Sequence, residues 1–199
     1  MHTRYRLVVR MAVCYNGRMQ ITYFVHSITD DNEQGLATGW LEGSLSEEGV
    51  KRAKKLEELR ADDHFDAVFC SDLRRATESC DLFFKGAYPV LLDWRLRECN
   101  YGDFDGRPAT EFKKGRETEY IQIPYPNGES YLDVERRMKN FLRDAHDHFS
   151  NGHIAIVAHQ APQLALDVIT KQQTWHQAIE NDWRKTQAWQ PGWAYQFSE

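Results

Sequence analysis

The chain has 199 residues, of which 41% are hydrophobic and 13% aromatic, so it is long enough to bury the core of one domain or at most two. Its formal net charge is -5 and it contains no long basic run, which excludes a broad electrostatic surface for nucleic acid. No apolar run approaches the roughly 18 residues that cross a bilayer. We therefore expect a soluble, single-domain protein with neither nucleic acid nor membrane as a partner.

Residues 1–18 carry four arginines and no acidic residue, a composition that faintly suggests a targeting segment. Arg10 interrupts the apolar stretch, however, and no small-residue cleavage signal follows it. A disordered extension and an upstream translation start both remain open. We assign residues 1–18 no function and predict that the domain occupies residues 19–199.

From Met19 onward, short apolar runs alternate with helical patterns. The predicted strands are residues 21–25, 67–70, 90–92 and 154–158, and each is continuously apolar, as is typical of strands buried on both faces. The helices between them have these apolar faces: Val50, Ala53, Leu56 and Leu59, after a Ser46 cap; Leu73, Ala76, Cys80 and Phe83; Val134, Met138, Phe141, Ala145 and Phe149, from near Glu129; and Ala161, Leu164, Ala165, Val168 and Ile169. This alternation predicts an α/β fold, a three-layer αβα sandwich whose mainly parallel central sheet carries helices on both faces.

Three polar residues directly follow predicted strands. His26, Ser71 and His159 each come just after the last apolar residue of a strand. Because ligands bind beyond the carboxyl ends of the strands in such sheets, we expect these side chains to gather at one edge.

The C-terminal residues and the cysteines favour structural roles. Trp175, Ile179 and Trp183 have helical spacing and an aromatic, strand-like end follows, so we interpret residues 174–197 as packing. The cysteines form no CxxC pair and no zinc spacing; they are Cys14, Cys70, Cys80 and Cys99. Buried free thiols in a reducing, cytoplasmic compartment are favoured over disulfides.

Several familiar sites are excluded by their motifs. The chain has no GxxxxGK[ST], GxGxxG, HExxH or GxSxG sequence. A cysteine phosphatase needs an arginine six residues after its thiolate, and Arg75 follows Cys70 one residue too soon. His146 and His148 are two residues apart on a predicted helix and do not share a face, which makes them a poor metal pair.

What remains is a set of polar residues at strand ends and in the loops beyond them, namely His26, Asn32, Arg75, Glu98 and His159. A histidine can attack phosphorus, an arginine can bind phosphate oxygens in pairs, and a second histidine can stabilise developing charge. Taken singly, each residue has a structural alternative, such as a satisfied histidine, a helix-surface arginine or a solvated glutamate. Only the joint pattern favours chemistry on a phosphoryl group.

These residues lie in blocks that resemble the histidine phosphatase (phosphoglycerate mutase-like) superfamily, phosphatase branch. YFVHSITDDNEQGLATGWLEGSLSEEG is similar to its first motif, in which Arg-His-Gly is followed by an asparagine and later by Gly-Trp. The corresponding residues are His26, Asn32, Gly39 and Trp40 in that block, Arg75 in SDLRRATES, Glu98 in LRECNYGDFDG, Gly128 to Ser130 in PNGESYLDVERRM and His159 in IAIVAHQ. The blocks occur in the family's order, from residue 20 to about 170.

The resemblance implies a phosphohistidine mechanism that requires neither metal nor cofactor. His26 would attack the phosphoryl group while Arg75, His159 and Asn32 hold its oxygens. Glu98 would donate a proton to the departing alcohol and then take one from the hydrolytic water. The residues expected to bind substrate are Asn32, Ser27, Thr38, Gly39 and Gln160.

Three positions depart from the family's pattern. Val25-His26-Ser27 stands for Arg-His-Gly, Ile28 stands where an acidic residue is common, and Gln160 stands for glycine after His159. Losing one charge-assisted contact to a phosphoryl group removes roughly 1.5 to 3 kcal/mol if nothing replaces it. Two explanations stay open. The substrate's phosphate carries less charge here, as in a diester or an internally bonded phosphoryl group, or another cation fills the gap, the candidates near Glu98 in sequence being Arg95, Arg97 and Arg107.

The leading prediction is a metal-independent phosphohydrolase that acts on a small phosphorylated metabolite. A catalytically weakened phosphate-binding regulatory or interaction protein is the alternative that Val25 motivates. A phosphoglycerate mutase-type phosphotransferase comes third, because residues 98–128 are too few for the large insert that mutases of this family use.

Specificity would come from residues 107–127, whose basic cluster is Lys113, Lys114 and Arg116. This cluster could meet a second anionic group, although a solvated helix face is favoured. The sequence leaves the substrate and the oligomeric state open, a homodimer being one alternative.

Overall fold

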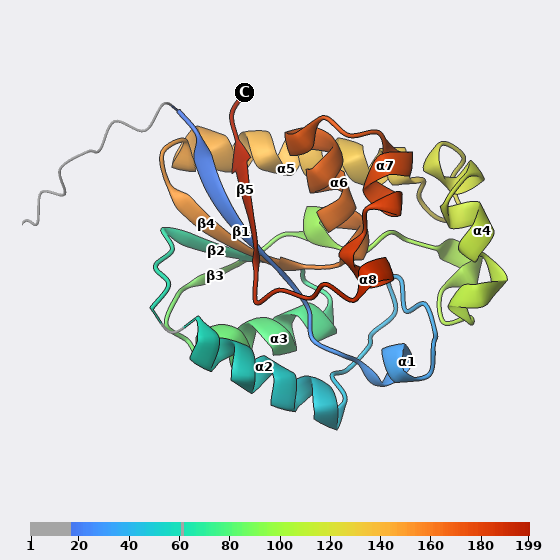
Figure 1. The fold of residues 1–199 in the computed structure, drawn as a ribbon, viewed down its shortest axis with the longest axis horizontal. Helices are drawn as coiled ribbons and strands as arrows, with labels where there is room; N and C mark the ends of the chain where they lie inside the picture. Colours follow the sequence, from blue (N-terminus) through green and yellow to red (C-terminus); the bar gives the residue numbers. More distant parts are fainter. Residues whose placement is uncertain (1–16, 61) are drawn as a thin grey trace, which may run out of the picture.

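The computed structural model describes residues 17–60 and 62–199, whose strands form a single mixed sheet. Its strands are β1 (Met19–Val25), β2 (Ala67–Cys70), β3 (Val90–Leu92), β4 (His153–Ala158) and β5 (Trp193–Phe197), in the order β3-β2-β4-β1-β5. All neighbouring pairs are parallel except β1 with β5, which is antiparallel. The predicted fold class and the four predicted strands are confirmed, and the aromatic C-terminal end forms the antiparallel edge (Figure 1).

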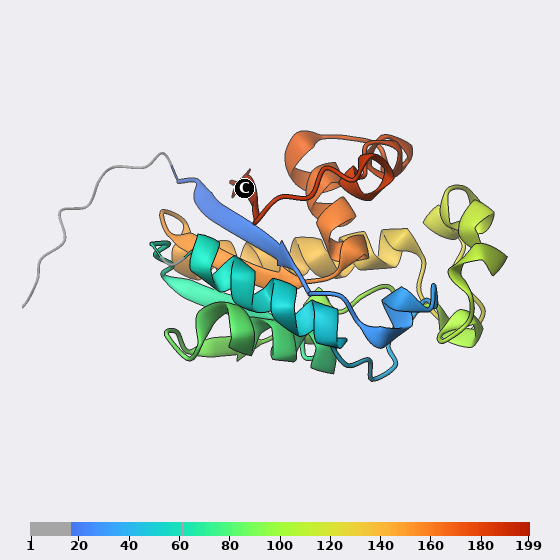
Figure 2. The same cartoon turned by 60° about the horizontal axis from the view of Figure 1, so that its bottom comes forward.

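Helices cover both faces of the sheet. α2 (Glu47–Leu59) and α3 (Arg74–Phe84) lie on one face, and α5 (Tyr131–Phe149), α6 (Gln160–Lys171) and α7 (Trp175–Glu180) lie on the other (Figure 2). The shorter helices are α1 (Asp30–Glu33), α4 (Lys113–Arg116) and α8 (Trp183–Thr186), and the 3-10 turns are Trp94–Leu96, Gly102–Phe104, Ala109–Glu111 and Glu119–Ile121.

The continuous apolar character of the strands has a simple structural cause. In β1, Ile21 and Tyr23 belong to the core beneath α5 and α6, whereas Phe24 belongs to the core beneath α2 and α3. In β4, Ile156 and Val157 are divided between the same two cores. Because successive side chains point to opposite faces, a strand with helices on both sides has no polar face.

Most of the predicted helix faces are buried as expected. Ser46 caps α2 and its hydroxyl accepts from the N–H of Gly49 at 3.1 Å. Leu59 is the exception, because α2 ends there and the side chain remains 54% exposed. Trp175 and Trp183 do not share one helix, since α7 ends at Glu180 and α8 begins two residues after Asn181.

The remaining expectations concern thiols, membrane spans and the N-terminal residues. Cys70, Cys80 and Cys99 are free and buried, as expected. None of the helices in residues 17–60 and 62–199 is both long enough and apolar enough to span a membrane. The prediction for residues 1–18 falls largely outside the described residues, as does Cys14.

The parallel register brings the predicted strand-end residues to one edge. The N–H of His26 donates to the carbonyl of Ala158 at 2.9 Å, directly before His159. The N–H of Ser71 donates to the carbonyl of Val157 at 3.0 Å. His26, Ser71 and His159 therefore lie side by side beyond the carboxyl ends of β1, β2 and β4.

Candidate active site

The ring of His26 is held by one nitrogen and leaves the other without a partner among the described residues. Its Nδ1 lies 2.7 Å from the carbonyl oxygen of Ser27, and because a carbonyl only accepts, Nδ1 carries the proton. The other ring nitrogen, Nε2, therefore has a lone pair, and it makes no hydrogen bond with the described residues. Burial, together with the charge of Arg75, lowers the pKa of the His26 ring to about 3. The ring is therefore neutral, and able to attack an electrophile, at any physiological pH.

His159 lies beside it with one nitrogen unpartnered. The two ring centres are 5.0 Å apart, and Nε2 of His159 lies 2.8 Å from the hydroxyl of Ser71. That hydroxyl oxygen also accepts from the N–H of Leu73 at 3.3 Å. Nδ1 of His159 is buried and has no hydrogen-bond partner among the described residues, so it can bond to a ligand.

Arg75 supplies a buried positive charge. Its side chain is 2% exposed, and it donates to the carbonyl oxygens of Gly39 at 2.7 Å and Leu41 at 3.0 Å. Burial lowers the pKa of its guanidinium, although the carboxylates of Glu98 and Asp31 oppose this effect. No carboxylate of the described residues forms an ion pair with it, so its charge remains available to an anion.

Glu98 faces the same space from the loop after β3. Its carboxylate accepts from the backbone N–H groups of Cys99 at 2.8 Å, Gln160 at 3.1 Å and Ala161 at 3.0 Å. Two of these donors belong to the first turn of α6, whose N-terminus favours a negative charge. Glu98 is only 7% exposed, so the alternative interpretation of this residue as a solvated surface glutamate is wrong.

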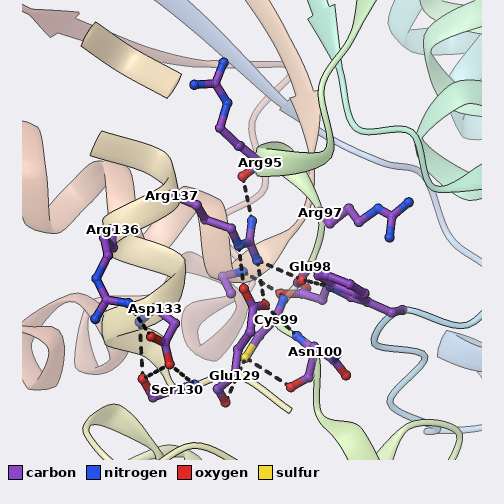
Figure 3. Close-up of polar contacts among 12 residues, drawn as sticks. Arg95, Arg97, Glu98, Cys99, Asn100, Glu129, Ser130, Asp133, Arg136 and Arg137 are labelled. Carbon is purple, nitrogen blue, oxygen red and sulfur yellow. Dashed lines mark hydrogen bonds and ion pairs between the residues drawn. The ribbon is translucent and has the colours of Figure 1, made fainter. Parts of the chain in front are cut away.

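A buried ion pair fixes the backbone around Glu98 (Figure 3). Nε of Arg137 donates to Glu129 at 2.9 Å, while its Nη atoms donate to the carbonyls of Arg95 at 2.6 Å and Glu98 at 2.9 Å. Glu129 also accepts from the N–H of Asn100 at 3.0 Å. The Gly-Glu-Ser block therefore holds the Glu98 loop in place, because Glu129 orients the arginine that binds this loop.

One pocket of about 260 Å³ collects most of the predicted site residues. His26, Asn32, Thr38, Gly39, Arg75, Glu98 and Gln160 all line it. The carbonyl oxygen of the Asn32 side chain accepts from the N–H of Thr29 at 3.2 Å, which leaves the amide nitrogen for a ligand. Gly39 has φ +54, and a Cβ there would lie 1.6 Å from Asp105, so only glycine fits. The hydroxyl of Thr38 donates to Asp31 at 2.9 Å.

Two predicted site residues do not line this pocket: His159, which is fully buried beside His26, and Ser27. The hydroxyl of Ser27 donates to the carbonyl of Gly49 at 2.7 Å, and its N–H donates to Ser79 at 2.9 Å. These bonds tie the loop after β1 to α2 and α3. Ser27 lines a second and larger cleft that also includes His26.

Six residues outside the predicted set also line the pocket, and two of them, Tyr101 and Arg116, have long polar side chains. Arg116 donates from Nε to the hydroxyl of Tyr131 at 3.0 Å and from Nη2 to the side-chain oxygen of Gln160 at 2.7 Å. The sequence signal for this residue was its place in the basic cluster of residues 113–116. The prediction that this cluster is a solvated helix face is wrong for Arg116, whose guanidinium is bonded to Tyr131 and Gln160. The side chains of Lys113 and Lys114 lie outside the described residues.

The arginines near Glu98 in sequence do not fill the place of the missing arginine. Arg97 pairs with both carboxylate oxygens of Asp72, at 2.7 and 2.6 Å, and Arg95 pairs with Asp93 at 2.7 Å. Figure 3 shows both guanidinium groups pointing away from Glu98. Arg107 lies 3.7 Å from Glu111 and does not line the pocket. Within the described part of the chain, no group of three or more His, Cys, Asp or Glu residues is placed to hold a metal ion.

Sequence comparison relates this chain to phosphoryl-transfer enzymes. Residues 24–181 match the sequence profile of the histidine phosphatase superfamily (branch 1). A 2,3-bisphosphoglycerate-dependent phosphoglycerate mutase of Haemophilus ducreyi is 33% identical over 111 residues, which cover 52% of this chain and 49% of that protein. The chain thus spans about half the length of such curated relatives. The mutase of the same description from Rhizobium meliloti is 31% identical over 167 residues, covering 74% of this chain and 79% of that protein.

Structural comparison agrees with the sequence match. The structure is similar to that of the alpha-ribazole phosphatase from Shigella flexneri, with a TM-score of 0.72 and 25% sequence identity. The similarity covers 81% of this chain and 84% of that chain. The likeness therefore extends over most of both chains.

The orientation of His26 leads to a prediction about its titration. We expect the ring to remain neutral, with the proton on Nδ1, from about pH 8 down to about pH 4, whereas an unfolded histidine titrates near 6.5. Below about 6.5 the unfolded chain binds a proton that the folded chain does not, so the contribution of His26 to stability falls as the pH falls toward about 3. The measurement is the imidazole ¹⁵N chemical shift against pH, assigned with the His26→Gln variant. A midpoint between about 6 and 7 for His26 contradicts the expectation.

Proposed function

Because this chain belongs to the histidine phosphatase superfamily, we propose that it removes a phosphoryl group from a small phosphorylated metabolite through a phosphohistidine on His26. One observation carries the proposal, namely the free Nε2 of a neutral His26 beside the unpartnered, buried Nδ1 of His159. In this proposal Nδ1 of His159 carries the ring proton and donates to an oxygen of the phosphoryl group that His26 attacks. Arg75, whose charge no carboxylate of the described residues neutralises, adds attraction for the same anion.

In the first step, Nε2 of His26 attacks phosphorus and the ester bond to the leaving oxygen breaks. Arg75, the Asn32 amide and Nδ1 of His159 donate to the phosphoryl oxygens, whose charge increases in the transition state. Glu98 in its protonated form gives its proton to the leaving oxygen, which departs as an alcohol. The proton on Nδ1 of His26 stays on that nitrogen and remains donated to the Ser27 carbonyl, so the phosphorylated ring carries a positive charge and keeps its orientation.

In the second step, water attacks phosphorus and the bond to Nε2 of His26 breaks. Glu98, now a carboxylate, takes a proton from this water, and phosphate departs. In the structure Glu98 is a hydrogen-bond acceptor held by three N–H groups, the form that this second step uses.

Two other functions have a specific observation in their favour. Curated relatives of this chain are phosphoglycerate mutases, which supports transfer to a second hydroxyl group rather than to water. Val25 supports a phosphate-binding regulator with little turnover. We favour hydrolysis over the mutase because residues 98–128 form only short turns and one short helix, with no large insert over the pocket.

Loss of the nucleophile tests the proposed function. We expect the wild type to release phosphate from at least one ester in a panel of sugar, nucleotide, amino-acid and glycerate phosphates, with EDTA present, and His26→Ala to release none. The matched control is His148→Ala, since His148 bonds only to the carbonyl of Asp144 in its own helix. Equal release by wild type and His26→Ala excludes the proposal. Isomerisation of 3-phosphoglycerate without phosphate release favours the mutase, and binding without either reaction favours the regulator.

The role of Glu98 can be separated from its structural bonds by changing the leaving group. We expect Glu98→Gln to slow hydrolysis of an alkyl phosphate by about 10²- to 10⁴-fold, because an alkoxide departs poorly without a proton. Hydrolysis of 4-nitrophenyl phosphate should fall less than about 10-fold, because that leaving group needs no proton. Steady-state rates of both substrates give the ratio, and Glu58→Gln, an exposed position on α2, is the control. Equal losses with the two substrates contradict the acid role.

A further inference from the structure

A second cleft of about 610 Å³ opens on the other side of His26. Val25, His26, Ser27 and Ile28 form one wall, and α2 contributes Arg52, Lys55 and Leu56. The remaining wall comes from the C-terminal segment, through Trp183, Arg184, Gln187 and Trp189. Residues interpreted from the sequence as packing therefore lie beside the candidate nucleophile.

Val25 leaves space on the side of the sheet from which α8 approaches. Along β1 the side chains of Ile21, Tyr23 and Val25 point to the same face, because side chains alternate along a strand. All three contact the core formed with α5 and α6, and that core also includes Trp175 and Ala178 of α7. Val25 and Arg184 line the same cleft, so the longer side chain of an arginine at position 25 would take up part of the space that valine leaves open.

Arg184 is fixed in the wall of this cleft. Its Nη1 donates to Asp182 at 2.9 Å and its Nη2 donates to the side-chain oxygen of Gln163 at 3.2 Å. Its guanidinium lies 4.4 Å from the ring of Trp183, which stacks on Trp193 of β5 at 4.9 Å. The side chain keeps 25% of its surface exposed, and these two bonds leave further N–H groups of the guanidinium free.

Gln160 links this arginine to the catalytic pocket. Its side-chain nitrogen donates to the second carboxylate oxygen of Asp182, a residue only 5% exposed, and its side-chain oxygen accepts from Arg116 at 2.7 Å. The chain of contacts therefore runs from Arg116 in the smaller pocket, through Gln160 and Asp182, to Arg184 in the larger cleft. Glycine, which the family has at position 160, has no side chain with which to make this link.

The charge of Arg184 reaches His26. Arg184 is among the groups that lower the pKa of the His26 ring, after burial and the charge of Arg75. Both residues also line the same cleft. Arg184 is ion-paired with Asp182 at 2.9 Å. The other cations of this cleft lie on α2: Arg52 pairs with Glu48 at 2.8 Å on an exposed helix surface, and Lys55 is exposed.

From this geometry we infer that Arg184 binds the phosphoryl group in place of the arginine that the family has before its nucleophilic histidine. The inference rests on the proposed function, because it concerns the phosphoryl group that His26 attacks. Arg75 would hold this group from the smaller pocket and Arg184 from the larger cleft. The two substitutions Val25 and Gln160 then act together. Val25 leaves space in the cleft for the phosphoryl group, and Gln160 holds Asp182, which holds Arg184.

Binding of inorganic orthovanadate, which resembles the phosphoryl group in transfer, tests the inference without turnover. We expect Arg184→Gln to weaken vanadate binding by about 10- to 100-fold, the loss of one charge-assisted contact. Arg184→Lys keeps the charge without the planar fork, so its loss should be smaller. Adding Val25→Arg to Arg184→Gln should restore most of the affinity, because it returns the guanidinium from the strand side.

Lys185→Ala is the matched control, since the neighbouring Lys185 lies 3.1 Å from Glu117 and does not line either cavity. Dissociation constants come from calorimetric titration, and thermal unfolding of each variant shows that it is folded. The inference is overturned if Arg184→Gln binds vanadate as tightly as Lys185→Ala, if Val25→Arg fails to restore the loss, or if the wild type does not bind vanadate. Arg184-dependent vanadate binding without hydrolysis of any ester would uphold this inference and refute the hydrolase alone.

Discussion

The parallel pairing of β1 with β4 is the constraint on which the candidate site depends. Val25 is aligned with Ala158, so the next residue of each strand, His26 and His159, leaves the sheet at the same point. The ring centres then lie 5.0 Å apart without any help from a loop. Because both strands are buried between helices, a shift of register would expose apolar side chains. The packing of the core therefore also fixes the relative position of the two histidines.

The charged side chains that line the smaller pocket lie around these histidines, and their charges are not neutralised by ion pairs among the described residues. Arg75 and Arg116 are bound by carbonyl, hydroxyl or amide oxygens and not by carboxylates of the described residues, so their charges are not cancelled by a neighbour. Glu98 is held at the N-terminus of α6, where the helix dipole stabilises it without an arginine partner. An anion entering the pocket would complete these interactions, which is the arrangement expected of a site for phosphoryl transfer.

The departures from the family's motifs gain a physical interpretation from the C-terminal segment. In a site that has decayed, a substituted side chain is expected to have unpaired polar atoms. Gln160, which stands where the family has glycine, instead makes a hydrogen bond with both its side-chain oxygen and its side-chain nitrogen. The partners of that amide, Arg116 and Asp182, come from two segments that are far apart in sequence. This degree of integration supports a site that is rebuilt around Val25 over one that has decayed.

The sequence predicts the sheet and the main helices well because their signals are local. Strands buried on both faces are continuously apolar, and the motif spacings place His26, Glu98 and His159 after strands and Arg75 in the first turn of α3, positions that the parallel topology brings to one edge. The placement of Arg116 and Arg184 could not be predicted, for a different reason. It depends on how the turns between Gly102 and Ile121 and the segment after α7 pass over the sheet, and those segments carry no regular hydrophobic period. Ser27 was predicted to bind substrate, but its bonds to Gly49 and Ser79 depend on tertiary packing against α2 and α3.

The central claim is that His26 is a nucleophile and becomes phosphorylated, and the most direct measurement is to trap that intermediate. The wild type, mixed with an ester that it hydrolyses and quenched in alkali, should gain one phosphoryl group in its intact mass. Peptide mapping should place that group on the His26 ring. Turnover without any phosphorylated protein, or a phosphoryl group on a residue other than His26, would contradict the account.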